Sequence, residues 1–378
     1  MSFQFGFSNG DLSDDELNNS EISAQPVQES NAAPSQVYVG RTLLDSPHLQ
    51  SNAVKQPNWE SLDAILQSLK DVRLSFEKFS TPQNQVPIYR RELFDVKHQL
   101  MTEADELTGS EAKVELEILM GETNEDVRKN VYEGGLKSWE CSIDLVDALA
   151  TSLNNEQLPD TIIELGCGTS LPTEYLFMKL LESNCPPNKT NFILSDYNES
   201  VLRLVTIPNF IIAWANIALT AEQRSALQQQ GEESLNLPDD ELLLTSDLLL
   251  AFREDLSRRN INLSLISGAW SRRFNDMVLT AIHPNRNLWI LSSETIYQPE
   301  TLPVISEVLI ELLSQHKQQY KYSARALVAA KDIYFGVGGS IIEFQHYIES
   351  RIREDALNLS MQILKVNAGL KRSIVVIE

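Results

Sequence analysis

A short glycine-rich turn is the feature of this sequence with the clearest chemical potential. The stretch E-L-G-C-G-T at residues 164–169 follows an apolar run, the pattern of a strand that enters a tight turn and then a helix. Gly166 and Gly168 would let the backbone approach a ligand, and the helix N-terminus offers free N–H groups. A turn that only packs helix against strand is the alternative. Because the third glycine of the dinucleotide fingerprint is missing, we expect another ligand.

Two further strand-like runs end in residues suited to a nucleoside. Residues 191–195 lead into Asp196, whose carboxylate can accept hydrogen bonds from both ribose hydroxyls. Residues 263–267 lead into G-A-W, and Trp270 offers a flat apolar face and one N–H donor. Asp196 would otherwise cap the next helix, and Trp270 would otherwise be a core residue. The three turns together predict a nucleoside-type ligand across the carboxyl ends of parallel strands.

Two other stretches carry polar groups that could act on a substrate. Residues 132–142, Y-E-G-G-L-K-S-W-E-C-S, contain two glycines that would let a loop fold over a ligand. Glu294 and Tyr297 form an E-x-x-Y pattern after the strand-like run 287–292, and they supply a carboxylate and a phenol hydroxyl. Ordinary turns and helix caps fit the same residues equally well.

These motifs resemble those of the seven-strand methyltransferases that use S-adenosylmethionine, and more narrowly the histidine protein methyltransferase family. The similarity rests on Y-E-G-G-L-K-x-W-E-C, S-E-T-I-Y, Y-F-G-V-G-G and G-L-K-R, which begin at residues 132, 293, 334 and 369. It covers residues 131–378, and the opening M-S-F-Q-F-G-F is also similar to the start of family members. Fungal members of the family modify a histidine of a large-subunit ribosomal protein.

The resemblance implies S-adenosylmethionine as the cofactor. The glycine turn would lie beneath the methionine moiety with Glu164 near its amino group, and the loop after residue 267 would lie along the adenine. The expected cofactor contacts comprise Ser138, Trp139, Glu140, Cys141, Ser142, Glu164, Gly166, Gly168, Asp196, Tyr197, Asn198, Gly268, Ala269, Trp270 and Ser293.

The resemblance also places Glu294 and Tyr297 where a substrate nitrogen meets the donated methyl group. A histidine ring has a pKa of about 6.5 and is largely neutral at physiological pH, so a strong base is unnecessary. The ring needs an acceptor for the N–H of its other nitrogen, which leaves the reacting nitrogen with a lone pair. We expect Glu294 to be this acceptor and Tyr297 to assist, in a protein-histidine N-methyltransferase that methylates the distal ring nitrogen.

Two other functions stay open on the sequence. One is a lysine methyltransferase of the related E-x-x-Y group. The other is a non-catalytic chaperone for a ribosomal protein, which the acidic tail and an insertion would suit.

Composition limits the partners. The 378 residues carry a formal net charge of −22, which argues against nucleic-acid binding and suits a basic partner such as a large-subunit ribosomal protein. The bland alternative is that the acidity only keeps the chain soluble. We expect a monomer in the cytoplasm and nucleus, with no membrane-spanning run, no secretory signal and no metal site. Cys141, Cys167 and Cys185 are expected to be reduced thiols.

Three regions are expected along the chain. Residues 1–56 have no lysine or arginine before Arg41 and read as a disordered acidic tail. We expect residues 1–50 to be dispensable for cofactor binding. Residues 57–130 read as an extension with an amphipathic helix over 58–79. Residues 131–378 read as the methyltransferase domain, with an insertion at about 216–260.

The predicted fold class is α/β, with a seven-strand Rossmann-like sheet, helices on both faces and a helical N-terminal extension. Apolar runs predict strands at 161–165, 191–195, 263–267, 287–292, 324–330 and 373–377. Helical spacing predicts helices at 142–153, 172–183, 302–317 and 340–354, and two more within the insertion. Residues 93–100 fit a strand or a short helix.

Overall fold

The computed structural model describes most of the chain from residue 42 onward. The described ranges are 42–104, 133–154, 156–183, 189–229, 237–283, 286–320, 322–334, 338–366 and 371–378. Arg41–Glu378 forms one compact unit. Most of the predicted acidic tail, including its phenylalanines, and residues 105–130 of the predicted extension lie outside the described residues.

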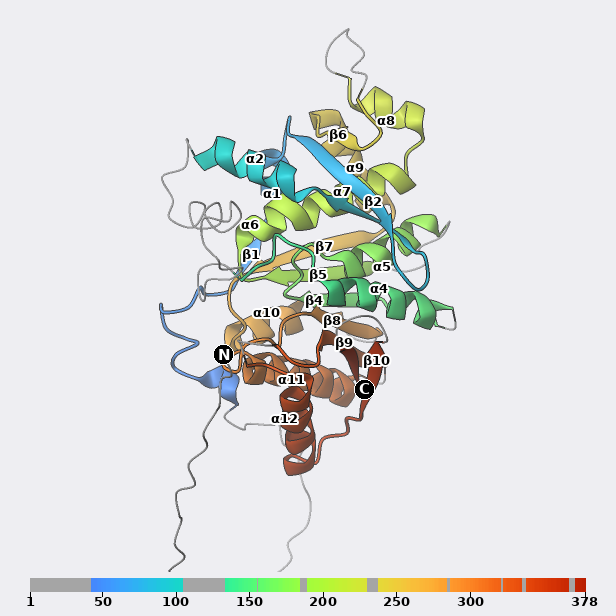
Figure 1. Cartoon of the computed structure of the whole chain (residues 1–378). Coiled ribbons are helices and arrows are strands. Elements are labelled where there is room, and N and C mark those ends of the chain that lie inside the picture. Colours follow the sequence, from blue (N-terminus) through green and yellow to red (C-terminus); the bar gives the residue numbers. More distant parts are fainter. Residues whose placement is uncertain are drawn as a thin grey trace, which may run out of the picture. The chain divides into compact units, whose positions relative to one another are not determined.

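An eight-stranded sheet forms the centre of this unit (Figure 1). Its strands are β1(Asn58–Glu60), β4(Thr161–Leu165), β5(Thr190–Asp196), β7(Ile261–Ser267), β8(Leu288–Ser293), β9(Ala324–Lys331), β10(Met361–Val366) and β11(Arg372–Ile377). Their order is β1-β7-β5-β4-β8-β9-β11-β10. Strands β7, β5, β4, β8 and β9 are parallel, whereas β1, β10 and β11 pair antiparallel with their neighbours.

Both faces of the sheet are buried, which explains why its parallel strands read as continuous apolar runs. Successive residues point to opposite faces, so Ile162 belongs to one hydrophobic cluster and Ile163 to the other. One face is covered by α1(Leu62–Ser68), α4(Glu140–Leu153), α5(Leu171–Glu182), α7(Ile207–Ile217) and α9(Ser246–Arg258). The other is covered by the short 3-10 helix η1(Leu43–Asp45) and by α10(Arg272–Ala281), α11(Leu302–Gln319) and α12(Ile341–Glu354) (Figure 1). The predicted α/β class with helices on both faces is confirmed.

The sheet has eight strands rather than the predicted seven. The additional edge strand is β1, where Asn58 pairs with Ser267 and Glu60 with Leu265. β10 was also not predicted, because its inward and outward residues alternate weakly and most of them are partly exposed.

The predicted helix over residues 58–79 is wrong. Only the middle of this stretch is helical, where Ser61 caps α1 by accepting a hydrogen bond from the Ala64 N–H. Asp71 then adopts a left-handed backbone, and β2(Arg73–Ser80) follows. In β2 the buried residues Leu74 and Phe76 alternate with more exposed ones, which is the spacing of a strand.

A small sheet joins the extension to the insertion. β2 lies between β3(Pro87–Arg91) and β6(Glu241–Leu243), and both pairs are antiparallel. The insertion between β5 and β7 also contains its two expected helices, α8(Ala221–Leu227) and α9. The open assignment of residues 93–100 is settled as helix, since α2 spans Leu93–Ala104.

Among the described residues, one helical stretch has the length and composition to cross a membrane. It is Glu199–Ile217, 19 residues with a mean hydropathy of 1.4, and 78% of it is buried inside the fold. It comprises α6(Glu199–Val201), the π-helical turn η2(Leu202–Thr206) and α7, and Phe210 of α7 contacts the Phe177 ring of α5. A helix that is apolar on all sides is typical of a protein core. The burial of this stretch within the fold explains why it is so apolar.

Asp147 of α4 ties the extension to the central layer. Its carboxylate accepts hydrogen bonds from the Thr81 hydroxyl and from the N–H groups of Gln83 and Asn84, at 3.0 and 2.9 Å. These three donors form the turn between β2 and β3. Asp147 is 2% exposed. If its carboxylate were removed, little water could reach the three donors of the turn to replace it as acceptor.

We predict that Asp147→Ala lowers the free energy of unfolding by about 1–3 kcal/mol. Urea denaturation would measure this change. The control is Asp276→Ala, an exposed acid on α10, which should change the free energy of unfolding by less than about 0.5 kcal/mol. Equal effects of the two substitutions would show that the Asp147 contacts do not hold the turn.

Candidate active site

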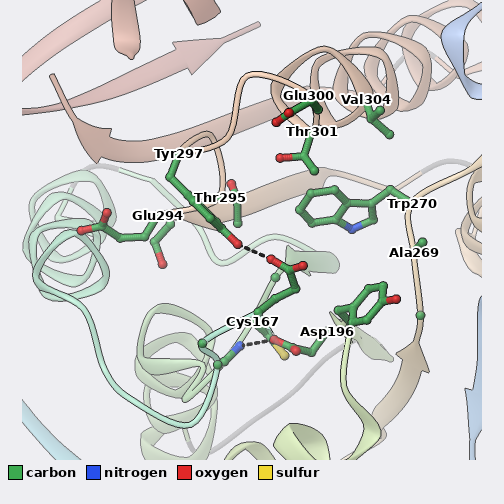
Figure 2. A pocket seen from close by; sticks show the side chains of 18 of the residues that line it. Cys167, Asp196, Ala269, Trp270, Glu294, Thr295, Tyr297, Glu300, Thr301 and Val304 are labelled. Atoms are coloured by element: carbon green, nitrogen blue, oxygen red, sulfur yellow. Dashed lines mark hydrogen bonds between the residues drawn. The ribbon is translucent and has the colours of Figure 1, made fainter. Parts of the chain in front are cut away.

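A cavity of about 410 Å³ lies where β4, β5, β7 and β8 end (Figure 2). After β4 the chain passes outward through β5 to β7 and then returns to β8 on the other side of β4. The cavity therefore sits at the point where the strand order reverses, which is where open α/β sheets bind ligands. Of the predicted site residues, it is lined by Trp139, Ser142, Gly166, Gly168, Asp196, Tyr197, Gly268, Ala269, Trp270, Ser293, Glu294 and Tyr297.

The glycine turn has no room for side chains. Gly166 and Gly168 have positive φ angles of 64° and 50°, a left-handed backbone that favours glycine. A Cβ on Gly166 would lie 2.6 Å from Cγ2 of Thr295, and one on Gly168 would lie 3.1 Å from the carbonyl oxygen of Gly135. The turn thus brings bare backbone to the floor of the cavity.

Asp196 is a buried carboxylate at the end of β5. Its Oδ2 accepts the Gly168 N–H at 3.0 Å, and its Oδ1 accepts the Asn198 N–H at 3.2 Å (Figure 2). Burial raises the pKa of Asp196 to about 6, although these N–H donors oppose the rise. These two hydrogen bonds give Asp196 a structural role in holding the loops. The side chain also lines the cavity, and each carboxylate oxygen has a further lone pair that can accept a ligand's hydrogen bond.

The loop after β7 closes the cavity beside Trp270. Gly268 has a φ of 104°, and its N–H donates to the carbonyl oxygens of Asp196 and Tyr197 at 3.0 and 3.1 Å. The next N–H, of Ala269, donates to the carbonyl oxygen of Lys55 at 2.8 Å. Trp270 points its ring toward the centre of the view in Figure 2, as a flat ligand wall requires.

Five predicted residues support the cavity without lining it: Ser138, Glu140, Cys141, Glu164 and Asn198. Ser138 shares a 2.9 Å hydrogen bond with Thr169, and the side-chain oxygen of Asn198 accepts the Glu133 N–H at 3.3 Å. Burial raises the pKa of Glu164 to about 7, and this carboxylate accepts the Ser170 hydroxyl at 2.7 Å.

The other two supporting residues, Glu140 and Cys141, are the first two residues of α4. Glu140 forms an ion pair with Lys331 at 3.3 Å. The ammonium of Lys331 also lies over the Trp139 ring. Burial, and then the neighbouring Glu294 carboxylate, raise the pKa of the Cys141 thiol.

Glu294 is held in an unusual conformation. Its φ of 56° is left-handed, a strain of roughly 1–3 kcal/mol that clusters at functional sites. Its Oε2 accepts the Tyr334 hydroxyl at 2.6 Å, and its Oε1 lies 3.8 Å from Lys331 Nζ. Oε1 accepts no hydrogen bond from the described residues.

Glu133 is a cavity residue that the predicted site did not contain. Its carboxylate accepts the Tyr297 hydroxyl, the dashed line from Tyr297 in Figure 2. Burial and the Glu133 charge raise the pKa of Tyr297, so its hydroxyl keeps its proton. The only signal in the sequence was the Y-E-G-G motif itself.

Residues before β1 also line the cavity, although no sequence motif points to them. They are Leu43, Ser46, His48, Leu49 and Val54. All five fall inside the predicted disordered tail of residues 1–56, so the folded unit starts before that boundary. Further lining residues are Lys137, Thr169, Thr295, Glu300, Thr301 and Val304.

The cavity fits the cofactor that the sequence motifs imply. Bare backbone at Gly166 and Gly168, a buried carboxylate at Asp196 and an indole at Trp270 match a methionine tail, a ribose and a flat base. No group of three or more His, Cys, Asp or Glu side chains within the described residues could hold a metal ion.

Comparison with known proteins gives close relatives. Histidine protein methyltransferase 1 of Saccharomyces cerevisiae is 49% identical over 100% of this chain and 98% of its own length. The protein of the same name from Schizosaccharomyces pombe is 32% identical over 76% of this chain and 75% of its own length. A homologue from Rattus norvegicus is 28% identical over 66% of this chain and 58% of its own length.

Solved structures are more distant. The methyltransferase domain of bacterial CtHen1 is 15% identical, covers 63% of this chain and 97% of its own, and has a TM-score of 0.33. An O-methyltransferase from Bacillus cereus in complex with SAH is 10% identical, covers 76% of this chain and 99% of its own, and has a TM-score of 0.32. No protein-family model matches.

Identity of 49% along the whole chain, together with a methyltransferase-like cavity built from the predicted motifs, leads to one assignment. The chain belongs to the histidine protein methyltransferase family.

Proposed function

We propose that this protein transfers a methyl group from S-adenosylmethionine to the distal ring nitrogen of a histidine in a basic large-subunit ribosomal protein. One observation carries the proposal: ten of the fifteen expected cofactor residues line the same cavity as the expected substrate residues, Glu294 and Tyr297. The names of the relatives support the histidine as the target.

The cofactor residues have separate tasks. The turn at Gly166 and Gly168 would hold the methionine moiety against bare backbone, Asp196 would bind the ribose hydroxyls, and Trp270 would cover the base. The bound cofactor supplies a methyl group that is already activated by a positively charged sulfur. The protein therefore contributes mainly proximity and orientation, rather than acid or base strength.

Glu294 is suited to orient a neutral imidazole. Its position is fixed by Tyr334 and by the strained backbone. Oε1 has no hydrogen-bond partner among the described residues and is closed off from solvent, so the side chain must turn toward the cavity to accept a substrate N–H. An N–H donated by one ring nitrogen leaves the lone pair on the other, which is the form that attacks a methyl group.

Lys331 favours histidine over lysine as the substrate. Its ammonium already pairs with Glu294 at 3.8 Å and with Glu140 at 3.3 Å. A second ammonium beside this group would be repelled by the Lys331 charge, whereas a neutral imidazole needs only a hydrogen-bond acceptor.

The net charge of −22 supports a basic substrate protein, because opposite charges speed encounter. A ribosomal substrate would place the protein in the cytoplasm and nucleus, acting as a monomer in ribosome biogenesis or translation.

Mass spectrometry of ribosomal proteins from cells with and without the gene tests the proposal. We expect one histidine-containing peptide to lose one methyl group in cells that lack the protein. Loss of a methyl group from a lysine would indicate the related lysine methyltransferases, and an unchanged set of peptides would indicate a non-catalytic chaperone.

Asp196 gives the cofactor affinity a pH dependence. Its pKa of about 6 lies above the ordinary value because burial disfavours the charged form, and ribose hydroxyls bind best to that charged form. Protonation below this pKa should therefore weaken binding, by roughly tenfold between about pH 7 and pH 5. Calorimetric titration with S-adenosylmethionine would measure the dissociation constant at each pH.

Asp196→Asn is the control for this prediction. It should bind the cofactor weakly at every pH, with a flat profile, while its thermal unfolding shows that it is folded. A parent profile that is also flat would mean that the Asp196 carboxylate does not contact the cofactor.

We predict that Glu294→Gln keeps the cofactor affinity and slows methyl transfer. The amide has nearly the same shape but no charge to accept the imidazole N–H, a loss on the order of 1–3 kcal/mol. That corresponds to roughly ten- to hundredfold in a single-turnover rate. Tyr297→Phe should cost less, since it removes one hydroxyl and keeps the ring.

Glu133→Gln is the matched comparison, because Glu133 is the other carboxylate bonded to a tyrosine in this cavity. A larger loss of rate in Glu133→Gln than in Glu294→Gln would move the orienting role to Glu133. An unchanged rate with weaker cofactor binding in Glu294→Gln would place Glu294 among the cofactor contacts instead.

A further inference from the structure

The segment before β1 crosses the cavity as a strap, residues 42–57. It follows no sequence pattern of a binding site, yet five of its residues line the cavity. The strap is fastened at both ends to the part of the chain that follows β7.

Arg272 at the start of α10 fastens the first end. Its guanidinium donates to Asp45 Oδ1 at 2.9 Å and to the Thr42 hydroxyl at 2.8 Å. Asp45 also accepts the Thr42 N–H at 3.2 Å, and the neighbouring Leu44 is fully buried in the cluster beneath. A guanidinium presents several donors in a rigid plane, so it fixes the orientation of this turn as well as its position.

The second end is fastened through backbone. The carbonyl oxygen of Lys55 accepts the Ala269 N–H at 2.8 Å, and β1 then pairs with β7. Gly268 lies so close to the strap that an added Cβ would be 2.6 Å from the carbonyl oxygen of Gln56. The Gln56 amide donates to the carbonyl oxygens of Leu49 and Ser51, at 3.1 and 2.9 Å, which stiffens the strap between its ends.

The strap faces the base end of the cavity. It is bonded to the loop that carries Ala269 and Trp270, and the Lys55 N–H donates to the Tyr197 hydroxyl at 3.4 Å. Leu43, Leu49 and Val54 add apolar surface to the same cavity that the indole lines. Apolar side chains together with an aromatic ring suit a flat base.

We propose that the strap is a wall of the cofactor site and that Arg272 is the residue that positions it through Asp45. This inference rests on the proposed function in one respect, that the cavity holds S-adenosylmethionine. Tight binding then requires a fastened strap, and the bound adenosyl group in turn slows the strap's opening, because a ligand stabilises the state it binds. The proposal is incompatible with the expectation that residues 1–50 are dispensable for cofactor binding.

Comparing Asp45→Ala with Glu311→Gln distinguishes the effect of the Arg272–strap contact from that of the other contact that Arg272 makes. Both residues accept hydrogen bonds from Arg272, but Asp45 belongs to the strap and Glu311 to α11. In the full chain we expect Asp45→Ala to raise the calorimetric dissociation constant for S-adenosylmethionine by about tenfold, and Glu311→Gln to change it by less than about threefold. Leu49→Ala, which leaves the anchor intact, should also weaken binding.

Hydrogen exchange of the amides in residues 42–57 gives a second measurement. In the parent, the cofactor should slow exchange in this segment, and in Asp45→Ala the segment should exchange faster without cofactor. Unchanged affinity in both Asp45→Ala and Leu49→Ala, or exchange that the cofactor does not alter, would overturn the proposal. A parent protein that binds no S-adenosylmethionine would instead overturn the proposed function itself.

Discussion

The backbone around Asp196 is the constraint on which the site depends. The side chain of Asp196 accepts the Gly168 N–H from the loop after β4, and its carbonyl oxygen accepts the Gly268 N–H from the loop after β7. Three loops from neighbouring parallel strands are therefore tied to one residue. Both donors are backbone groups, so the only side chain that these two bonds require is that of Asp196. The carboxylate that is expected to bind a ligand is also the one that assembles the ligand's site, which explains why a charge is retained in so buried a place.

Much of the sheet could be predicted from the sequence because of its burial. Strands that are covered on both faces must be apolar throughout, and such runs are visible without any structure. The predicted strand at 161–165 coincides with β4, and those at 191–195 and 263–267 fall within β5 and β7. Glycines and acids at the ends of these runs then located the cavity, because the carboxyl ends of parallel strands must meet at one edge.

The remaining parts depend on contacts between distant residues. Residues four apart share a face in a strand as well as in a helix, so Val72 and Phe76 were assigned to a helix until the partners β3 and β6 were known. The strap is polar and has no period at all. Its position comes from Arg272 and Ala269, more than two hundred residues later in the chain. No local pattern encodes such a contact.

The long separation in sequence between β1 and β7 also governs the order in which the molecule can assemble. β1 occupies the edge of the sheet beside β7, where Asn58 pairs with Ser267. An uncovered edge strand offers its backbone to any other chain that can pair with it. During synthesis the N-terminal residues emerge first but have no partner until β7 has been made and the sheet has formed around β4 and β5. Docking of β1 is therefore a late event that closes a very long loop, and until it occurs the edge of β7 is open to aggregation.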